Sequence, residues 1–350
     1  MKAAGVKRAA TIRDVAREAD VSVASASRAL NGSDSVAAGT RTRVLDAAKR
    51  LRYVPHVGAR SLITRRTGMV GVLLPDVYGE FFSELIRGVD IGARSKGLHL
   101  FVSSSHGDAD EAVAVLHAMR GRVDGMIVMS PHLNERVVSE CLTGKLPVVL
   151  MNMRGTTKRF PTINIDNCRG AEAMVEHLFE RGHRRIALVK GPKGNFDADE
   201  RLRGYRNALR RLGLEAGPIL HGDFSEESGR AAVRQLASAG ALPDAVFALN
   251  DMMAIGCLSA FAEAGIAVPG QVAVAGFDDI PIASYVSPGL TTIRVDIARL
   301  GGVAFEKLAG AFASPNMAPA TAETLPPELI VRGSSGCRES DSSKRKTRGV

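Results

Sequence analysis

The chain has 350 residues, of which 45% are hydrophobic and 24% charged, and its formal net charge is +9 at pH 7. That length accommodates two or three globular domains. No apolar run reaches 18 residues and the amino-terminal stretch MKAAGVKRAATIRD has no apolar core, so we expect neither a membrane span nor an export signal, and we predict a cytoplasmic protein. The four cysteines are far apart and fit no metal-binding spacing, so we expect reduced thiols, no metal and no cofactor.

The positive charge is concentrated at the two ends of the chain. Residues 1–66 hold 14 Lys and Arg against 5 Asp and Glu, and residues 337–350 hold 5 against 2, whereas the segment between them is slightly acidic. A basic module joined to a near-neutral body indicates a polyanion as the partner of that module. The alternative is a basic end that only improves solubility.

The first predicted element is a two-turn helix that begins after Thr11. Thr11 and Asp14 have the spacing of a capping box, and apolar residues then recur at helical spacing as far as Ala19. Asp20 and Val21 interrupt this pattern. A short amphipathic helix followed by a break is typical of the first half of a helix-turn-helix.

The stretch VSVASASRALNG supplies a second helix, capped by Ser22 and covering Val23–Leu30, with Asn31 and Gly32 at its end. A third helix is predicted over Gly39–Arg52. Small residues on the inner face of the second helix permit close packing, so the three helices form a helix-turn-helix with its own small core.

Several residues of the second helix remain on its outer face. Serine hydroxyls at a helix amino terminus suit phosphate contacts, and Arg28 suits guanine, while Val23 and Ala24 suit thymine methyl groups. This pattern favours DNA binding. The alternative is a helix-turn-helix that serves only as a protein-interaction module.

From residue 68 onward, apolar β-rich runs alternate with helical stretches, which indicates an α/β fold of parallel sheets covered by helices. We divide the runs into two successive sets and therefore predict two similar lobes. The first set is VGVLLP, LHLFVSS, DGMIVMS and PVVLMN, and the second is TINID, RIALVKG, AVFALN and VAVAGF.

Polar residues follow several of these predicted strands, where open α/β sheets bind ligands. They are Asp76, Asn152, Asp166, Asn250, Asp251 and Asp278, and Arg201 begins the nearby stretch RLRGY. Carboxylates and amides facing an arginine suit a polyhydroxylated ligand. The alternative for Asp76, Asp166 and Asp251 is a helix-capping role.

An enzyme on the α/β body is the rival class of function. The sequence contains no P-loop, no GxSxG, no HExxH and no GxGxxG at a strand-to-helix turn. We therefore predict that the protein is not an enzyme.

Longer motifs carry a family resemblance. The stretches TIRDVAREADVSVASASRALNGSDSV, YVP and ARSLITRRTGMVGVLLPD, and later RLRGY, LNDMMAIG and VAGFDDIPIASYVSPGLTTI, resemble the lactose-repressor (LacI/GalR) family of bacterial transcription regulators over nearly the whole chain. This resemblance implies a helix-turn-helix headpiece and a two-lobed effector domain like the periplasmic binding proteins, with Rossmann-like parallel sheets.

The resemblance also implies the domain boundaries. The headpiece covers residues 1–55, a hinge helix or linker 56–67, and the effector-binding and dimerisation domain 68–336, followed by a disordered basic tail, 337–350. Lobe 1 takes about 68–162 and 292–320, and lobe 2 about 163–291 and 321–336.

The resemblance assigns DNA contacts to the headpiece and hinge, with Leu62 of the hinge wedged between base steps in the minor groove. The DNA-binding residues it implies are Thr11, Ser22, Val23, Ala24, Ser25, Ser27, Arg28, Asn31, His56, Ala59, Arg60 and Leu62. This sequence departs from the family at Asp20, where glycine is usual in the turn, and at Ala37, where a serine usually caps the third helix. We expect a marginally stable headpiece.

The resemblance implies that Arg201, Asn250 and Asp278 hold the effector, with Asn152 and Asp166 nearby. To these predicted effector-binding residues we add Asp76, which follows a predicted strand, and Phe81 and Phe82, either of which can supply an apolar wall from the first lobe. We therefore predict a homodimeric repressor that binds a pseudo-palindromic operator under the control of a small metabolite, a sugar or sugar acid. The alternative effector is a nucleobase or another non-sugar metabolite. The sequence does not distinguish an inducer from a co-repressor.

Overall fold

The computed structural model describes residues 10–31, 33, 35–54, 66–142, 146–153, 159–240, 242–313 and 322–336. The chain divides into two compact units, Met1–Thr67 and Gly68–Val350, which are described separately below. The hinge residues His56, Ala59, Arg60 and Leu62 and the tail 337–350 lie outside the described residues.

The first unit contains three helices around a small core, as the sequence predicts. They are α1 (Ile12–Glu18), α2 (Val23–Leu30) and α3 (Ala38–Arg50). The core is made mostly of small residues: Val15, Ala16, Ala19, Ala26, Ala29, Val44, Ala47 and Ala48. The third helix ends two residues earlier than predicted, before Arg52, which has a φ of 49°.

The ends of these helices confirm the capping predictions. Thr11 and Asp14 form a capping box at the start of α1, and the Ser22 side chain accepts from the backbone N–H of Ser25 at the start of α2. Asp20 takes a left-handed backbone with φ of 52°, where glycine would be unstrained. Ala37 precedes α3 and makes no side-chain cap. The turn and the start of α3 are therefore the weak points of this unit.

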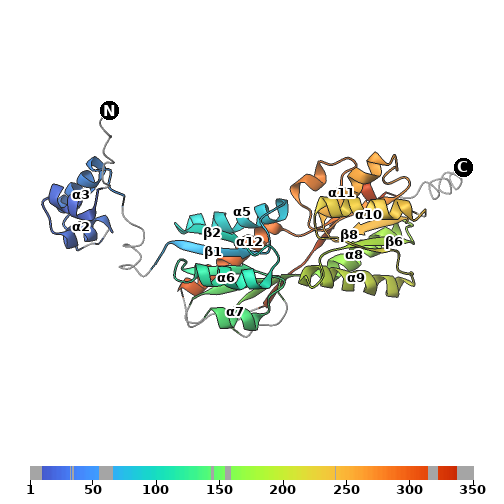
Figure 1. Cartoon of the computed structure of the whole chain (residues 1–350), viewed down its shortest axis with the longest axis horizontal. Coiled ribbons are helices and arrows are strands. Elements are labelled where there is room, and N and C mark those ends of the chain that lie inside the picture. Colours follow the sequence, from blue (N-terminus) through green and yellow to red (C-terminus); the bar gives the residue numbers. More distant parts are fainter. Residues whose placement is uncertain are drawn as a thin grey trace, which may run out of the picture. The chain divides into compact units, whose positions relative to one another are not determined.

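The body begins with a six-stranded parallel sheet in the order β11-β5-β4-β3-β1-β2 (Figure 1). Its strands are β1 (Met69–Leu74), β2 (His99–Ser104), β3 (Gly125–Met129), β4 (Val148–Met151), β5 (Thr162–Ile165) and β11 (Ala322–Leu325). Its helices are α5 (Glu80–Ser95), α6 (Ala109–Met119), α7 (Glu135–Cys141) and α12 (Ile297–Ala313).

Strand alternation sends the two faces of this sheet into different cores. Val72 and Leu74 of β1 pack with α5 and α12, whereas Leu73 packs with α6 and α7. The backbones of α5 and α12 approach closely: a Cβ on Gly88 would lie 1.9 Å from the carbonyl oxygen of Ala298. Glycine is therefore required at that crossing.

The assignment of two strands to the second lobe is wrong. The stretch TINID forms β5, which pairs with β4 of the first sheet, and β11 pairs in turn with β5. Residues 162–165 and 322–325 therefore belong to the first lobe. The sequence shows an apolar run but not its partners, which are β4 on one side and the distant edge strand β11 on the other.

The second lobe contains a four-stranded parallel sheet in the order β7-β6-β8-β9. Its strands are β6 (Ile186–Lys190), β7 (Ile219–His221), β8 (Ala245–Ala248) and β9 (Ala273–Ala275). The helix pairs α8 (Asn167–Glu180) with α9 (Phe196–Leu212), and α10 (Glu226–Ser238) with α11 (Asp251–Glu263), cover its two faces (Figure 1). Both lobes are thus doubly wound, as predicted.

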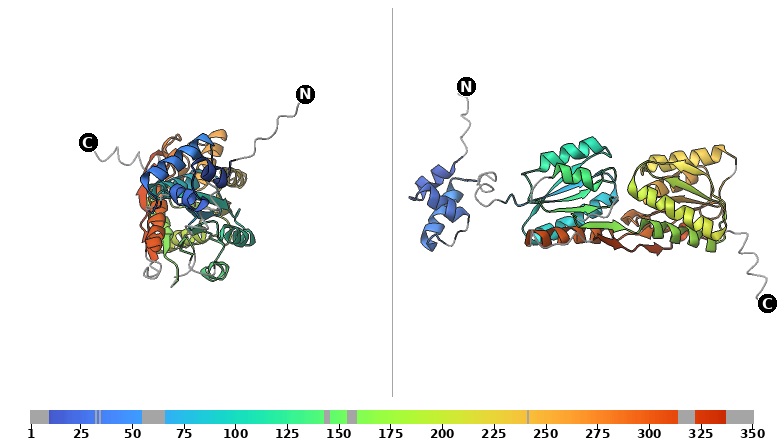
Figure 2. Two further views of the ribbon diagram at one scale, coloured as in Figure 1. Left: turned by 90° about the vertical axis from the view of Figure 1, so that its left-hand side faces the viewer. Right: turned by 90° about the horizontal axis from the view of Figure 1, so that it is seen from below.

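The chain passes between the lobes three times: after β5, between β10 (Thr292–Arg294) and α12, and between β11 and β12 (Glu328–Ile330). Strands β10 and β12 pair antiparallel. The right-hand view of Figure 2 shows these crossing segments along one side of the body. Within the described residues, no helix has both the length and the apolar character that a membrane span requires.

Candidate functional site

The outer face of α2 is the candidate nucleic-acid surface of the first unit. Val23 is 44% exposed, and Ser22, Ala24 and Arg28 are also exposed. Ser25 and Ser27 are half-buried at its border. Ala26 and Ala29 point into the core, so the helix presents the residues predicted to face DNA.

The polar side chains of this face already have partners in the free chain. The hydroxyls of Ser22 and Ser25 lie 2.9 Å apart, and Asn31 Nδ2 donates weakly to Ser27 Oγ at 3.5 Å. Arg28 Nε donates to the carbonyl oxygen of Ala24 at 3.3 Å. An exposed arginine held by one long hydrogen bond can swing outward at little cost.

Thr11 has the least freedom of the predicted phosphate ligands. Its hydroxyl donates to Asp14 Oδ2 at 2.7 Å, and its backbone N–H donates to the same oxygen at 2.8 Å. A hydroxyl committed to a carboxylate cannot also donate to a phosphate. Thr11 therefore serves α1 as its cap.

The second unit contains a cavity of about 410 Å³ between its lobes. Its walls are the segments that follow β1, β2 and β3 in the first lobe and β6, β7, β8 and β9 in the second. In each lobe the strand order reverses beside the first strand, between β1 and β3 and between β6 and β8, and ligands of doubly wound folds bind at such switch points. The topology thus places the cavity where the sequence predicted it.

Six of the eight predicted effector residues line this cavity: Asp76, Phe81, Phe82, Arg201, Asn250 and Asp278. Asn152 and Asp166 do not. Asp166 accepts from the backbone N–H of Arg169 at 3.1 Å and caps α8, which is the alternative role considered for it. Asn152 is fully buried and donates to Asp197 Oδ2 at 3.3 Å, so it lies behind the wall.

The cavity has further lining residues that the sequence reasoning missed. The polar and aromatic ones are Tyr78, His106, His132, Asn195, Asp197, Asp223, Phe224 and Ser225. Most lie one or more residues beyond a strand end, in loops whose path the sequence does not define. Asp223 and Phe224 follow β7, a three-residue strand that was not predicted. The signal that could have found them is the cluster GDFS between a short apolar run and a helix.

Arg201 is the centre of a buried hydrogen-bond network. Its Nη2 donates to Asp278 Oδ1 at 2.9 Å and its Nε donates to Asn167 Oδ1 at 2.8 Å, while Nη1 donates to the carbonyl oxygen of Leu249. Its guanidinium carbon lies 3.8 Å from the centroid of the Phe277 ring. These contacts use all three nitrogens and one face of the guanidinium, which fixes its position in the wall.

Two buried carboxylates share this single cation. Asn167 Nδ2 donates to Asp197 Oδ1 at 2.7 Å. Burial raises the pKa of Asp278 to about 6 although Arg201 opposes the shift, and the neighbouring Asp197 raises it further. Burial also raises the pKa of Asp197. Among the residues that line the cavity, the second lobe thus contributes three carboxyl groups, of Asp197, Asp223 and Asp278, and one arginine.

The wall formed by the first lobe is largely apolar. Phe81 and Phe82, at the start of α5, meet edge to face with ring centroids 5.4 Å apart. Tyr78 and Met129 extend this surface, and Phe224 faces the cavity from the second lobe. The cavity can thus hold a ligand with hydroxyl groups on one side and a flat or apolar part on the other.

Two histidines complete the rim. His106 Nδ1 lies 3.0 Å from the carboxylate of Glu111, and burial lowers the pKa of His132. The described residues contain no group of three or more His, Cys, Asp or Glu that could hold a metal ion.

Comparisons with known families match both units. Residues 11–56 match the family described as bacterial regulatory proteins, lacI family. Residues 175–335 match the periplasmic binding protein-like domain.

Individual relatives are similar over nearly the whole chain. The HTH-type transcriptional repressor CytR of Escherichia coli (strain K12) is 35% identical, over 95% of this chain and 98% of the relative. Among solved structures, the lac repressor dimer bound to operator and the anti-inducer ONPF has a TM-score of 0.83 and 28% identity, covering 94% of this chain and 100% of that one. A transcriptional regulator CelR–cellobiose complex has a TM-score of 0.69 and 30% identity, covering 93% and 99%.

Proposed function

The chain belongs to the lacI family of bacterial regulatory proteins and is a DNA-binding transcriptional regulator. We propose that it represses transcription as a homodimer, and that a neutral, polyhydroxylated metabolite controls its affinity for the operator. The observation that carries the proposal is the presence of two distinct binding surfaces on one chain. One is the exposed, serine-rich start of α2, and the other is the cavity between the lobes. The proposed place of action is the cytoplasm.

The operator is a pseudo-palindrome, because a two-fold dimer presents two copies of α2 to the major groove about one helical turn apart. Val23, Ala24 and Arg28 face base edges, while Ser22, Ser25, Ser27 and Asn31 face the backbone. The lac repressor dimer bound to operator, similar over nearly the whole chain, supports this arrangement. Basic residues concentrated in the first 66 positions supply a salt-dependent attraction to phosphate.

The effector is a sugar or a sugar-containing compound. Asp197, Asp223 and Asp278 offer carboxylate oxygens to hydroxyl groups, and Asn250 offers an amide. The bound cellobiose of the similar CelR structure supports a sugar. A sugar acid, considered from the sequence, is less favourable, because the charge of Arg201 is already paired with Asp278 and the cavity carries several carboxylates.

A nucleoside is the second candidate effector. The apolar wall of Phe81, Phe82 and Tyr78 could stack against a base while the ribose faces the carboxylates. A free nucleobase would leave the carboxylate side without hydroxyl donors. A nucleoside is therefore a better second candidate than a free nucleobase.

Regulation follows from linkage between the two surfaces. An effector changes operator affinity only through its preference for one of two arrangements of the lobes. Each lobe contributes one wall of the cavity, so ligand contacts depend on lobe closure.

A thermal-unfolding screen tests the proposal. Neutral sugars, sugar acids, nucleosides and nucleobases are compared, and a true effector raises the melting temperature in a concentration-dependent way. The proposal expects a neutral sugar or a nucleoside to stabilise the protein and to change its affinity for duplexes that it selects from a random pool. Stabilisation by sugar acids alone would contradict the proposed effector class.

A further inference from the structure

Two consecutive aspartates follow β9, and both have left-handed backbones. Asp278 has a φ of 117° and Asp279 a φ of 55°, values that are uncommon outside glycine. The backbone N–H of Asp278 donates to the carbonyl oxygen of Ile293 at 2.8 Å, and its carbonyl accepts from Val295 at 3.1 Å. The turn is therefore bonded to the segment that leaves the second lobe.

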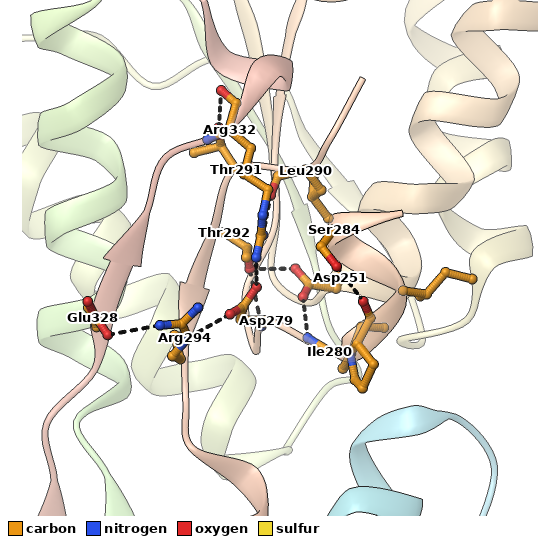
Figure 3. Close-up of polar contacts among 12 residues, drawn as sticks. Asp251, Asp279, Ile280, Ser284, Leu290, Thr291, Thr292, Arg294, Glu328 and Arg332 are labelled. Carbon is orange, nitrogen blue, oxygen red and sulfur yellow. Dashed lines mark hydrogen bonds and ion pairs between the residues drawn. The ribbon is translucent and has the colours of Figure 1, made fainter. Parts of the chain in front are cut away.

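The two carboxylates reach different parts of the molecule. Asp278 contacts Arg201 in the wall of the cavity, as described above. Asp279 accepts from Arg294 Nε at 2.7 Å and from Arg332 Nη2 at 2.6 Å (Figure 3). Its side chain is only 7% exposed, so this one carboxylate joins two arginines in a largely buried position.

Those two arginines belong to the segments that cross between the lobes. Arg294 is the last residue of β10, which continues into α12 of the first lobe. Arg332 follows β12, which returns from β11 of the first sheet. Arg294 Nη1 also contacts Glu328 of β12 at 3.3 Å, and Arg332 Nη1 donates to the carbonyl oxygen of Leu290. Asp279 therefore holds two of the three crossings together.

A second buried carboxylate supports the same turn. Asp251, at the start of α11, accepts from Thr292 Oγ1 at 2.6 Å and from the backbone N–H of Ile280 at 2.9 Å (Figure 3). Ile280 lines the cavity. The turn 278–280 is thus held by Asp251 on one side and by the crossing strands on the other.

We propose that Asp279, clamped to Arg294 and Arg332, is a positioning residue that transmits effector binding at Asp278 to the crossing strands and so sets operator affinity. None of the three clamp residues is among those that line the cavity. Asp279 keeps the crossing strands β10 and β12 in a fixed position relative to Asp278, which lies in the cavity wall. This inference rests on the proposed function.

The test compares Asp279→Asn with Glu263→Gln in the full-length protein. Asp279→Asn removes the charge and keeps the shape of the side chain. Glu263→Gln breaks the exposed pair with Arg230 (2.7 Å) in the same lobe and serves as the matched control. Arg294→Gln is the second clamp variant, because its half-exposed position tolerates the change. Equal melting temperatures, within a few degrees, show that a variant is folded.

The first readout is amide hydrogen exchange in residues 290–297 and 326–332, which needs neither operator nor effector. The clamp predicts at least tenfold faster exchange there in Asp279→Asn and Arg294→Gln, with no change in α6 or in Glu263→Gln. The second readout is affinity for the duplex that the wild-type protein selects from a random pool, measured by fluorescence anisotropy. We expect at least tenfold weaker binding for both clamp variants, and no additional loss in the double variant because the residues act as one unit.

Unchanged exchange in the crossing segments would overturn the clamp. Faster exchange with operator affinity within twofold of the wild type would overturn its role in transmission. Failure of the wild-type protein to select any duplex would instead contradict the proposed function, while the exchange experiment would still decide whether the clamp holds the crossings.

Discussion

The hydroxyl of Tyr78, in the first lobe, donates a hydrogen bond of 3.2 Å to the carboxylate of Glu226, the first residue of α10 in the second lobe. A second contact joins the lobes nearby, where Glu80 accepts from the backbone N–H of Ile282 at 2.8 Å. Tyr78 lines the cavity, so these contacts lie at its edge. The carboxylate of Glu226 also raises the pKa of Tyr78, which keeps the hydroxyl protonated as a donor.

Tyr78→Phe should weaken effector binding, because closure of the lobes loses this contact. The effect should be about two- to fivefold, the range of exposed polar pairs. Isothermal calorimetry with the compound found in the thermal screen measures it. Tyr285→Phe, which removes a hydroxyl from a residue that is 84% exposed, is the control. Equal losses in both variants would show that the contact between the lobes has no specific role.

Effector affinity should depend on pH through Asp278. The pKa of this carboxyl is raised to about 6, whereas the ordinary Asp pKa is about 4. Between these two pH values the folded protein binds more protons than the unfolded chain. The contribution of Asp278 to stability therefore decreases as pH rises through this window. An effector hydroxyl donates more strongly to the ionised carboxylate than to the neutral carboxyl.

Affinity should therefore increase as pH rises through about 6, by up to about tenfold per pH unit below it. Calorimetry across this range measures the slope. Asp278→Asn should abolish that slope and weaken binding at neutral pH. A slope that persists in Asp278→Asn would assign the titration to another group, such as His132.

A serine at position 37 should stabilise the headpiece. Ala37 precedes α3 without any side-chain cap, so Ala37→Ser supplies an acceptor for the free N–H groups of the first turn. The expected gain in unfolding free energy is about 1 kcal/mol, and Ser22→Ala, which removes the existing cap of α2, should cost a similar amount. Amide exchange in residues 10–54 measures both. No added protection in Ala37→Ser would count against a marginally stable headpiece.

Arg28→Ala should weaken operator binding by about 1–3 kcal/mol and relax the preference at one base pair in each half-site. Anisotropy titrations against the selected duplex and its single-base variants test this. Arg17 on α1, 80% exposed at its side chain, provides the control: Arg17→Ala should leave the base preference unchanged. A uniform loss across all duplexes would assign Arg28 to the phosphate backbone.

The sequence predicts local features of this protein well. Ser22 and Thr11 start their helices as expected, because a cap depends only on residues three positions apart. Asn250 and Asp278 line one cavity because parallel strands place their carboxyl ends on a common edge, and Arg201 reaches the same cavity from α9.

Features that depend on distant parts of the chain were not predictable. The pairing of β5 with β11 joins residues about 160 positions apart, and the apolar run of β5 suits either sheet. The clamp at Asp279 likewise depends on Arg332, which lies beyond β10, α12, β11 and β12 in the chain. The sequence cannot show whether Asp166 caps a helix or binds a ligand, because both roles place an Asp after a strand. The structure distinguishes them, since the Asp166 side chain accepts from the backbone N–H of Arg169 at the start of α8.

Selection of duplexes from random and genomic pools by the purified wild-type protein, at moderate ionic strength, tests the central claim most directly. We predict enrichment of a pseudo-palindrome with half-sites about one helical turn apart, and a shift in its affinity when a neutral sugar or a nucleoside is added. Binding that is equal for all duplexes, with and without these compounds, would contradict the account.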